Sequence, residues 1–363
     1  MNADREPAGP RSPRRFPFED FTLVLTRDCN FACEYCPLEH GRRRMGTGVI
    51  ESFFAQLLEY VDHEVLVTLF GGEPLLNRRG VDRFFALAEE FAPRFAASGG
   101  VLRTKIVTNG LLVQTHLSRL IRHASIPGLA VELNISIDGG PGTQARQRPA
   151  RGAPRDCYSR LARAISAAKD SGVSLSLGMV AGFSSPSLVD DFKYLVDAFG
   201  VPIFVMPVDL TYEFITSCPD LPARLKEYAR KIRELLLFLH ANSAYGGMAV
   251  NLNEKEFRDL KLPPLGPAID WDGSVYVTRD FLFAMDHDVS FTPIGKLDAQ
   301  NLDRFVRGFG TSRDGMSAMA QAAMRTYFGR TMFVNKRIGD YFTRLVYSSR
   351  CDDDAQTSPD GRL

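Results

Sequence analysis

The sequence has few of the features that direct a chain to a membrane or to nucleic acid. No run approaches the roughly 18 uncharged apolar residues of a membrane-spanning helix. The formal net charge is +1, so neither sign is in excess to attract a phosphate backbone or an anionic lipid surface. Residues 1–16 contain arginines and prolines, but no apolar segment follows them as in an export signal. We therefore expect a cytoplasmic protein without a nucleic-acid or membrane partner.

Cysteine is also scarce, with six residues in 363, and without a secretory signal disulfides are not expected. Three of the six fall within eight residues, Cys29, Cys33 and Cys36, at the spacing C-x3-C-x2-C. Three thiols this close cannot all pair with one another, whereas thiolates at these gaps can converge on one iron–sulfur cluster. A cluster that only carries electrons usually has four cysteine ligands, so three ligands leave one iron open to a substrate or cofactor.

The rest of the first 210 residues alternates between strand and helix patterns. Apolar content of 45% and charged content of 24% are those of a globular protein with a large core. Such alternation predicts a parallel sheet covered by helices, and six units are too few for a closed eight-stranded barrel. The expected strands are 21–26, 65–70, 101–107, 129–137, 173–180 and 201–206, and the expected helices 50–61, 81–91, 112–123, 158–171 and 187–199.

Polar and glycine-rich segments follow the expected strands. Gly71-Gly72-Glu73-Pro74 follows the second strand, Thr108-Asn109-Gly110 the third and Ser136-Ile137-Asp138-Gly139 the fourth. Each alone is compatible with an ordinary turn. In parallel α/β folds, however, the carboxyl ends of the strands gather the chemistry. Together with the cysteine loop, these segments predict a single ligand site.

The cysteine spacing, with an aromatic residue before the last cysteine, resembles the radical S-adenosylmethionine (radical SAM) superfamily. The resemblance implies that Cys29, Cys33 and Cys36 hold a 4Fe–4S cluster whose open iron takes the amino and carboxylate groups of SAM. It also implies an α/β fold, a partial (β/α)6 TIM-like barrel. It places Tyr35 against the adenine side of the cofactor.

The same resemblance implies roles for the strand-end residues. The amino group of SAM falls to Glu73 with the Gly71–Gly72 backbone, and Asn109 borders the cofactor. Ser136 and Asp138 are expected near its ribose and carboxylate, and Arg148 matches an arginine that closes this loop. One departure stands out, because a His-Asp pair common in peptide- and sulfatase-modifying relatives is replaced here by Gln144-Ala145.

The C-terminal part resembles the SPASM or twitch extension of peptide-modifying members of the superfamily. Residues 268–278 predict a β-hairpin with Asp-Gly at its turn, and Ile294-Gly295-Lys296-Leu297 follows. The cysteines that flank this hairpin in relatives are missing, and only Cys351 follows Cys218, so we expect an α+β extension without an auxiliary cluster. The expected units are a disordered tail 1–16, a barrel 17–215, a connecting helix 216–247, the extension 248–350 and a disordered tail 351–363.

The resemblance implies one 4Fe–4S cluster that reductively cleaves SAM to a 5′-deoxyadenosyl radical, with electrons from an external flavodoxin- or ferredoxin-type donor. The favoured substrate is a ribosomally made peptide, which would be cross-linked or epimerised in natural-product biosynthesis. Because about 20 residues precede the first strand, such a substrate would need a separate leader-binding protein or no leader.

The alternatives are a small-molecule substrate, or a cluster-bearing scaffold without turnover. Cys218 is a candidate hydrogen donor to a substrate radical, and Cys157 a weaker one. For both, a small buried side chain is the competing interpretation.

Overall fold

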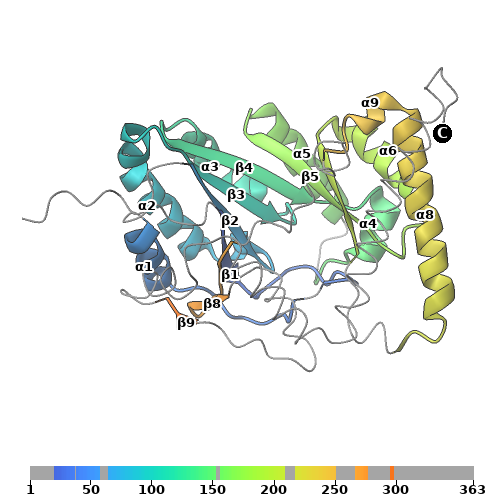
Figure 1. Ribbon diagram of the computed structural model, residues 1–363, viewed down its shortest axis with the longest axis horizontal. Helices are drawn as coiled ribbons and strands as arrows, with labels where there is room; N and C mark the ends of the chain where they lie inside the picture. Colours follow the sequence, from blue (N-terminus) through green and yellow to red (C-terminus); the bar gives the residue numbers. More distant parts are fainter. Residues whose placement is uncertain are drawn as a thin grey trace, which may run out of the picture.

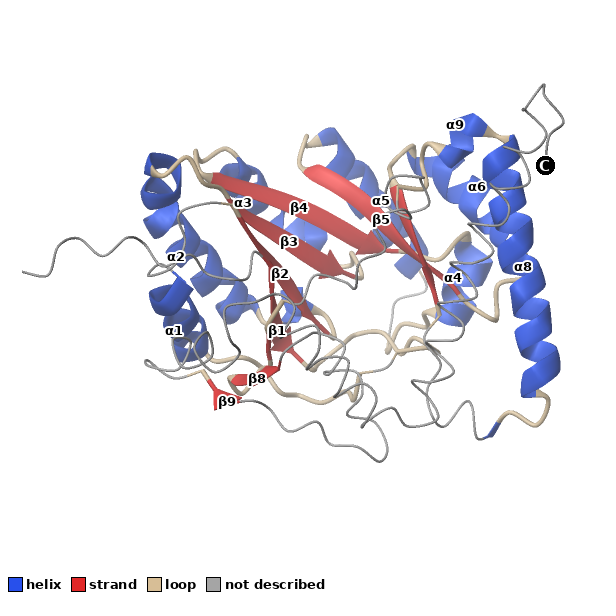
Figure 2. Cartoon of the chain, viewed as in Figure 1, coloured by secondary structure: helices blue, strands red, loops and turns tan. Residues whose placement is uncertain are grey.

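The computed structural model describes residues 20–36, 38–57, 64–152, 156–208, 217–250, 266–276 and 295–297. Within these ranges nine strands form one sheet in the order β6-β5-β4-β3-β2-β1-β7-β8-β9. The strands β1 to β6 pair in parallel and lie in chain order, with helices between them (Figures 1 and 2). The predicted partial barrel of six β/α units is therefore confirmed. Its elements are β1 (Asp20–Thr26), α1 (Thr47–Leu57), β2 (Val65–Gly71), η1 (Pro74–Leu76), α2 (Arg78–Ala97), β3 (Leu102–Thr108), α3 (Val113–Ala124), β4 (Leu129–Ser136), α4 (Pro141–Gln147), α5 (Cys157–Asp170), β5 (Ser174–Ala181), α6 (Leu188–Phe199) and β6 (Ile203–Pro207).

The six predicted strands agree with the observed ones to within two residues at each end. The helix predicted over 81–91 is longer, because α2 begins at Arg78 and continues to Ala97. Asn77 starts it early, since its side chain accepts a hydrogen bond from the Gly80 amide while its Nδ2 donates to the carbonyls of Leu25 and Met45. The short helices η1 and α4 were not predicted, and each has a proline at its first turn.

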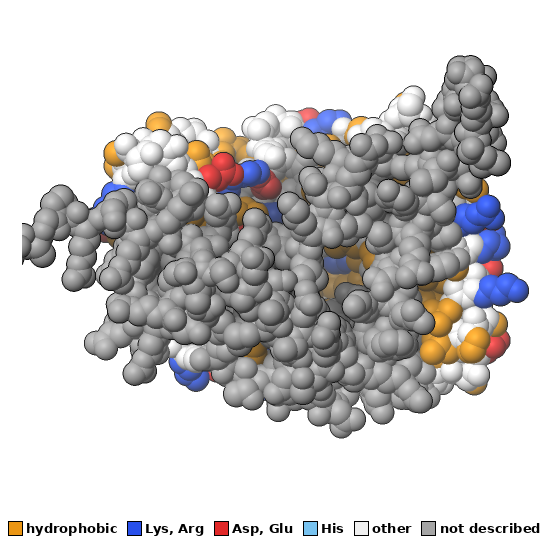
Figure 3. Space-filling view, in the orientation of Figure 1, with side chains coloured by type: hydrophobic (Ala, Val, Ile, Leu, Met, Phe, Trp, Pro, Cys, Tyr) orange, Lys and Arg blue, Asp and Glu red, His pale blue; other side chains and the backbone are white. Residues whose placement is uncertain are grey.

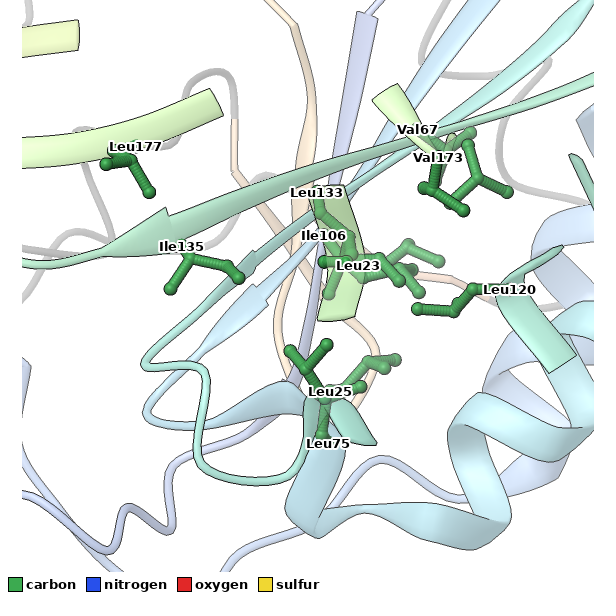
Figure 4. Close-up of a cluster of buried hydrophobic side chains, with 14 of the residues drawn as sticks. Leu23, Leu25, Val67, Leu75, Ile106, Leu120, Leu133, Ile135, Val173 and Leu177 are labelled. Atoms are coloured by element: carbon green, nitrogen blue, oxygen red, sulfur yellow. The ribbon is translucent and has the colours of Figure 1, made fainter. Parts of the chain in front are cut away.

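The sheet has one apolar face and a second face, called here the polar face, that carries the polar side chains together with apolar ones such as Val24, Phe70 and Phe204. In Figure 4, Leu23, Val67, Ile106 and Leu133 from successive strands gather with Leu120 of α3, and all five are buried. Burying a leucine of this kind stabilises the fold by about 1.5–3 kcal/mol. The strands alternate, so the residues between these core positions lie on the opposite face. The helices thus cover one face and leave the other for polar residues.

The polar face is concave. Arg103 and Lys105 of β3 lie on it and are partly exposed. The Nζ of Lys105 lies 4.9 Å from the centre of the Phe204 ring in β6, three strand positions away. On a flat sheet these strands would be about 14 Å apart. The contact fits a sheet that curves around this face, as in a partial barrel.

After β6 the chain continues into α8 (Leu221–Ala241) and α9 (Ser243–Gly246). The hydroxyl of Tyr228 donates to the Ala181 carbonyl (2.7 Å) and accepts from the Val208 amide (3.0 Å), which fixes α8 beside the last two strands. At the right-hand edge of Figure 3, the side of the molecule where Figure 1 places α8, basic and hydrophobic side chains are exposed together. On this helix the exposed Arg230 pairs with Glu227 and Glu234. Within the described ranges, no helix combines the length and apolar composition needed to cross a bilayer.

The predicted C-terminal hairpin is present and joins the barrel sheet. The strand β7 (Ala268–Ile269) pairs in parallel with β1, and β8 (Ser274–Tyr276) and β9 (Gly295–Lys296) continue the sheet antiparallel. Gly273 in the turn has φ of +83°, a left-handed conformation that favours glycine. Both predicted tails and most of the predicted extension 248–350 lie outside the described residues, and the domain boundaries given in the sequence analysis remain predictions.

His123 of α3 is a buried histidine outside the polar face. Its side chain is fully buried, its ring centre lies 4.4 Å from that of Phe85, and its Nδ1 is 3.5 Å from Glu89 Oε1. Burial lowers the pKa of His123 from its ordinary value of 6.5, with the Glu89 carboxylate acting in the opposite direction. The folded chain therefore holds this ring neutral at a pH where the unfolded chain protonates it.

We predict that acid destabilises the fold through His123. The unfolded state binds the extra proton as the pH falls below about 6.5, so the free energy of unfolding decreases by about 1.4 kcal/mol per unit of pKa shift until the folded ring also protonates. Denaturant unfolding of His123→Phe should show a weaker pH dependence between pH 7 and 5 than the wild type. Equal pH dependence in wild type and His123→Phe would contradict the prediction.

Candidate active site

The three clustered cysteines lie on a loop directly after β1. Its base is a narrow neck, formed by Thr26 and Arg27 on one side and residues 41–44 on the other. The Arg27 amide donates to the Arg43 carbonyl (2.9 Å), and the Gly41 amide donates to the Arg27 carbonyl (3.0 Å). Thr26 and Arg44 form an antiparallel bridge at the same level. The thiols are thus presented at the carboxyl end of the first strand, as the sequence predicted.

A second backbone pairing fixes the far side of the cysteine loop. The Ala32 amide donates to the Pro149 carbonyl (2.8 Å) and the Glu34 amide to the Gln147 carbonyl (2.9 Å). The Arg151 amide donates back to the Asn30 carbonyl (2.8 Å). The loop therefore pairs with the segment that follows α4 and carries Arg148.

The thiols themselves are enclosed. Cys29 is 9% exposed, and Cys33 and Cys36 are partly buried. Burial raises the pKa of Cys29 to about 12 and that of Cys33 to about 11; the Cys36 thiolate adds to both shifts, and the Cys33 thiolate adds to that of Cys29. None of the described cysteines forms a disulfide. A bound cation must therefore displace the thiol protons, as metal binding does at cysteine sites.

The chemistry of the donor set fits an iron–sulfur cluster, because cysteine thiolates are the usual ligands of such clusters. In an iron–sulfur cluster each thiolate binds its own iron, so the ligands stand further apart than those of a single metal ion. Three thiols on one loop, close enough to influence one another electrostatically, match that requirement.

The Gly71-Gly72 pair lies against the backbone of the cysteine loop. Gly71 has φ of +135°, and a Cβ built on it would lie 2.2 Å from the Thr26 carbonyl oxygen. A Cβ on Gly72 would lie 2.4 Å from the Asp28 carbonyl oxygen. The amides of Gly72 and Glu73 donate to these two carbonyls, at 2.9 Å each. Only residues without a side chain allow this approach.

Glu73 joins this segment to the end of β3. Its fully buried carboxylate accepts hydrogen bonds from the amides of Leu75 (3.0 Å) and Asn109 (2.7 Å) and from the Thr108 hydroxyl (2.8 and 2.9 Å). Burial raises the pKa of Glu73 to about 7, and the donors oppose that rise. The Nδ2 of Asn109 then donates to Asn30 Oδ1 (2.6 Å) and lies 3.9 Å from the Cys29 sulfur. The first three strand ends thus form one connected network.

Tyr35, Asp138 and Arg148 form the other side of the site. The Tyr35 hydroxyl donates to Asp138 Oδ2 (2.5 Å) and accepts from Arg148 Nη1 (2.6 Å). A second Arg148 contact reaches Asp138 Oδ1 at 3.7 Å. Burial raises the pKa of Asp138 while the Arg148 charge opposes it, and the pKa of Tyr35 is raised well above its usual range by burial. Arg148 Nε is buried without a hydrogen-bond partner among the described residues, which fits a ligand that brings a carboxylate.

Two glutamines that the sequence analysis did not assign support this group. Gln144 Oε1 accepts from the Asp138 amide (3.0 Å). In the amide orientation that satisfies both of its groups, Gln147 donates to Asp138 Oδ2 (3.2 Å) and accepts from the Ser185 amide (3.0 Å). Gln144 thus fixes the turn at Asp138. It occupies the position at which the resemblance leads us to expect a histidine in relatives. Thr108 was named as part of its strand-end segment but given no role, and here its hydroxyl donates to Glu73.

The remaining predicted residues are less closely joined to the site. Ser136 is partly buried at the end of β4, opposite Gly178 of β5. Cys218 is partly buried just before α8, and no described contact joins it to the cysteine loop. Cys157 is the first residue of α5, one residue before the expected start of that helix, and burial raises its pKa.

Comparisons with known proteins agree with this geometry. Residues 23–186 match the family described as the Radical SAM superfamily. The serine-type anaerobic sulfatase-maturating enzyme of Klebsiella aerogenes is 31% identical over 137 residues, which cover 36% of this chain and 33% of the relative. The GTP 3′,8-cyclase of a Synechococcus strain is 29% identical over 124 residues, 34% of each chain. The matches thus span about a third of these relatives.

Solved structures show the same fold over most of the chain. The structure of anSMEcpe with bound AdoMet has a TM-score of 0.63 at 16% identity and covers 79% of this chain and 80% of that one. Streptococcus suis SuiB bound to its precursor peptide SuiA has a TM-score of 0.52 at 15% identity, covering 79% of this chain and 64% of that one. At these identities the likeness concerns the fold.

We predict that Gly71→Ala disrupts the site more than its backbone strain alone explains. The new Cβ meets a backbone carbonyl that cannot move without opening the cysteine loop. Gly99→Ala is the matched control, because Gly99 also has positive φ (+72°) but open space around its Cβ position. Gly99→Ala should cost about 1 kcal/mol of folding stability, and Gly71→Ala at least about 2 kcal/mol more, with iron incorporation lost. Similar losses in the two variants would contradict the close approach.

We also predict that Tyr35→Phe weakens SAM binding without loss of iron. The phenol bridges Asp138 and Arg148, and losing a hydrogen bond to a charged partner costs about 1.5 kcal/mol, or roughly tenfold in dissociation constant. Equilibrium dialysis on the iron-loaded protein measures this change. Tyr158→Phe removes a phenol whose 3.4 Å contact to Gly139 lies outside the bridge, so it should bind SAM as the wild type does. Unchanged affinity in Tyr35→Phe would exclude the bridging role.

Proposed function

We propose that this chain is a radical SAM enzyme with one 4Fe–4S cluster held by Cys29, Cys33 and Cys36. The observation that carries the proposal is the double pairing of the cysteine loop, to the neck residues 41–44 and to the segment bearing Arg148. This arrangement presents three thiols beside two other polar strand ends. When bound, the reduced cluster and SAM together supply a 5′-deoxyadenosyl radical that removes hydrogen from a substrate carbon. A flavodoxin- or ferredoxin-type protein provides the electron.

Different residues of the site bind different parts of the SAM molecule. Gly71, Gly72 and Glu73 bind its amino group, and Asn109 borders the same region. On the other side, Ser136 and Arg148 bind the carboxylate and ribose region, with Asp138 holding Arg148 in place. Tyr35 contributes its ring to the adenine side and its hydroxyl to the Asp138–Arg148 pair. The buried, partly unsatisfied guanidinium of Arg148 supports the assignment of the carboxylate.

The concave face is where we place the substrate. Beyond the SAM residues it carries a cation and an aromatic ring, Lys105 and Phe204, and the amide of Asn134 hydrogen-bonded to Ser176 (2.9 Å). Because this face carries charged, polar and aromatic side chains, it suits a substrate that has both polar and apolar groups, such as a peptide. The peptide-bound state of SuiB and the bound Cp18Cys peptide of anSMEcpe support a ribosomally made peptide as the substrate.

The second candidate is a small natural-product intermediate. The match to GTP 3′,8-cyclase, whose name describes a nucleotide substrate, favours it. The two candidates differ in partners, because a peptide with a leader sequence calls for a leader-binding protein and a small molecule does not.

If the product is an epimerised peptide, Cys218 is the proposed hydrogen donor. Cys218→Ala should then still form 5′-deoxyadenosine from SAM but yield no epimer.

The C-terminal hairpin carries no cysteine among its described residues 268–276. In the sequence as a whole, only Cys351 follows Cys218. One thiol is too few for a second cluster of the usual kind. We therefore propose a single cluster and direct electron delivery to it.

The decisive experiment is anaerobic reconstitution of the chain with iron and sulfide, followed by dithionite and SAM. We expect about four iron atoms per chain and formation of 5′-deoxyadenosine. Iron and turnover should be lost in the triple variant Cys29→Ala, Cys33→Ala, Cys36→Ala, and retained in Cys157→Ala. Absence of 5′-deoxyadenosine, with candidate peptides and small molecules both present, would leave only the cluster-bearing scaffold. About eight iron atoms per chain would exclude the single cluster.

A further inference from the structure

The neck of the cysteine loop contacts a part of the chain more than 200 residues away. Arg27 Nε donates to Asp270 Oδ1 (3.2 Å) and Arg27 Nη2 to Asp270 Oδ2 (2.7 Å), across 243 residues of sequence. Their side chains are 3% and 6% exposed. This is a buried, bidentate ion pair, a geometry that the planar guanidinium group favours.

The next residue of the hairpin contacts the other side of the neck. Trp271 follows Asp270, and its ring lies 5.9 Å below the guanidinium carbon of Arg43. Arg27 and Arg43 are themselves joined by a backbone hydrogen bond that closes the neck. Two consecutive hairpin residues thus contact both sides of the neck.

Asp270 is itself held rigidly. Its amide donates to the Ser274 carbonyl (2.8 Å), its carbonyl accepts from the Gly273 amide (2.9 Å), and its Oδ1 accepts from the Trp271 amide (2.8 Å). The hairpin is anchored in turn by the parallel pairing of β7 with β1 at Thr22 and Leu23. The carboxylate therefore meets Arg27 from a fixed position.

The geometry points to a positioning role for this hairpin: through the Arg27–Asp270 pair, the C-terminal extension clamps the neck of the cysteine loop and so fixes where the three thiols stand. Cys29 lies two residues beyond Arg27, so a shift of the neck moves the first ligand directly. The hairpin thus serves the first cluster site instead of carrying a cluster of its own. This inference rests on the proposed cluster at Cys29, Cys33 and Cys36.

A buried ion pair by itself is weak evidence of a contribution to stability, because desolvation offsets the attraction between the charges. Removing one partner leaves a buried charge and can unfold the region. Replacing both partners by apolar residues avoids that cost. The informative variant is therefore the double substitution Arg27→Met with Asp270→Leu, which should fold while losing the directional tie.

The first test uses hydrogen exchange of the full-length protein without iron, so that it does not depend on cluster chemistry. In the double variant, the neck amides of Arg27, Gly41 and Arg43 should exchange at least tenfold faster than in the wild type. Amides of α5 and β6 should stay within twofold. The control is Glu51→Gln, which breaks the exposed Arg83–Glu51 pair and should leave the neck unchanged.

The second test measures the cluster after anaerobic reconstitution. The half-time of iron loss to a chelator should fall at least fivefold in the double variant, and the electron paramagnetic resonance change caused by SAM should be reduced. The reversed pair, Arg27→Asp with Asp270→Arg, should restore the exchange rates at least in part. Wild-type exchange rates and iron retention in the double variant would overturn the inference. Failure of the wild type to bind iron would overturn the proposed function, while the exchange test would still decide whether the hairpin clamps the neck.

Discussion

The site depends on one close approach between two backbones, that of Gly71 and Gly72 to the carbonyls of Thr26 and Asp28. The two amide hydrogen bonds made there bring the end of β2 against the start of the cysteine loop. Because no side chain separates them, Glu73 is placed where its carboxylate can reach the end of β3. The relation between the first three strand ends therefore follows from two residues without side chains.

Burial then decides the electrostatics of the site. Glu73, Asp138 and Tyr35 are held away from water, and this burial raises the pKa of each, while the hydrogen bonds to Glu73 and the Arg148 charge act in the opposite direction. The same enclosure keeps the Cys29 and Cys33 thiols protonated until a cation replaces the protons. Among the described residues, Arg148 Nε has no hydrogen-bond partner in this buried site, which suits it to bind an anionic group.

Much of the barrel was predictable, because apolar periodicity records which face each element buries. The strands were found to within two residues for this reason, and the cysteine loop and the strand-end segments stand at the positions that parallel topology requires. The short helix Pro141–Gln147 was missed because seven residues carry too little periodicity. The contacts of Gln144 and Gln147 were missed because they depend on which backbone amide or carboxylate lies within reach, and spacing does not reveal that.

The sequence by itself determined the class of chemistry and the order of the parts. Three features can be read directly from the sequence: the spacing of the three cysteines, the glycine pair, and the absence of cysteine between Cys218 and Cys351. Only the tertiary structure decided how those parts meet: that the cysteine loop pairs with the segment bearing Arg148, that Tyr35 lies between Asp138 and Arg148, and that Asp270 reaches Arg27. Each of these contacts joins residues more than 90 positions apart. They arise because the sheet brings strand ends together, which no local pattern encodes.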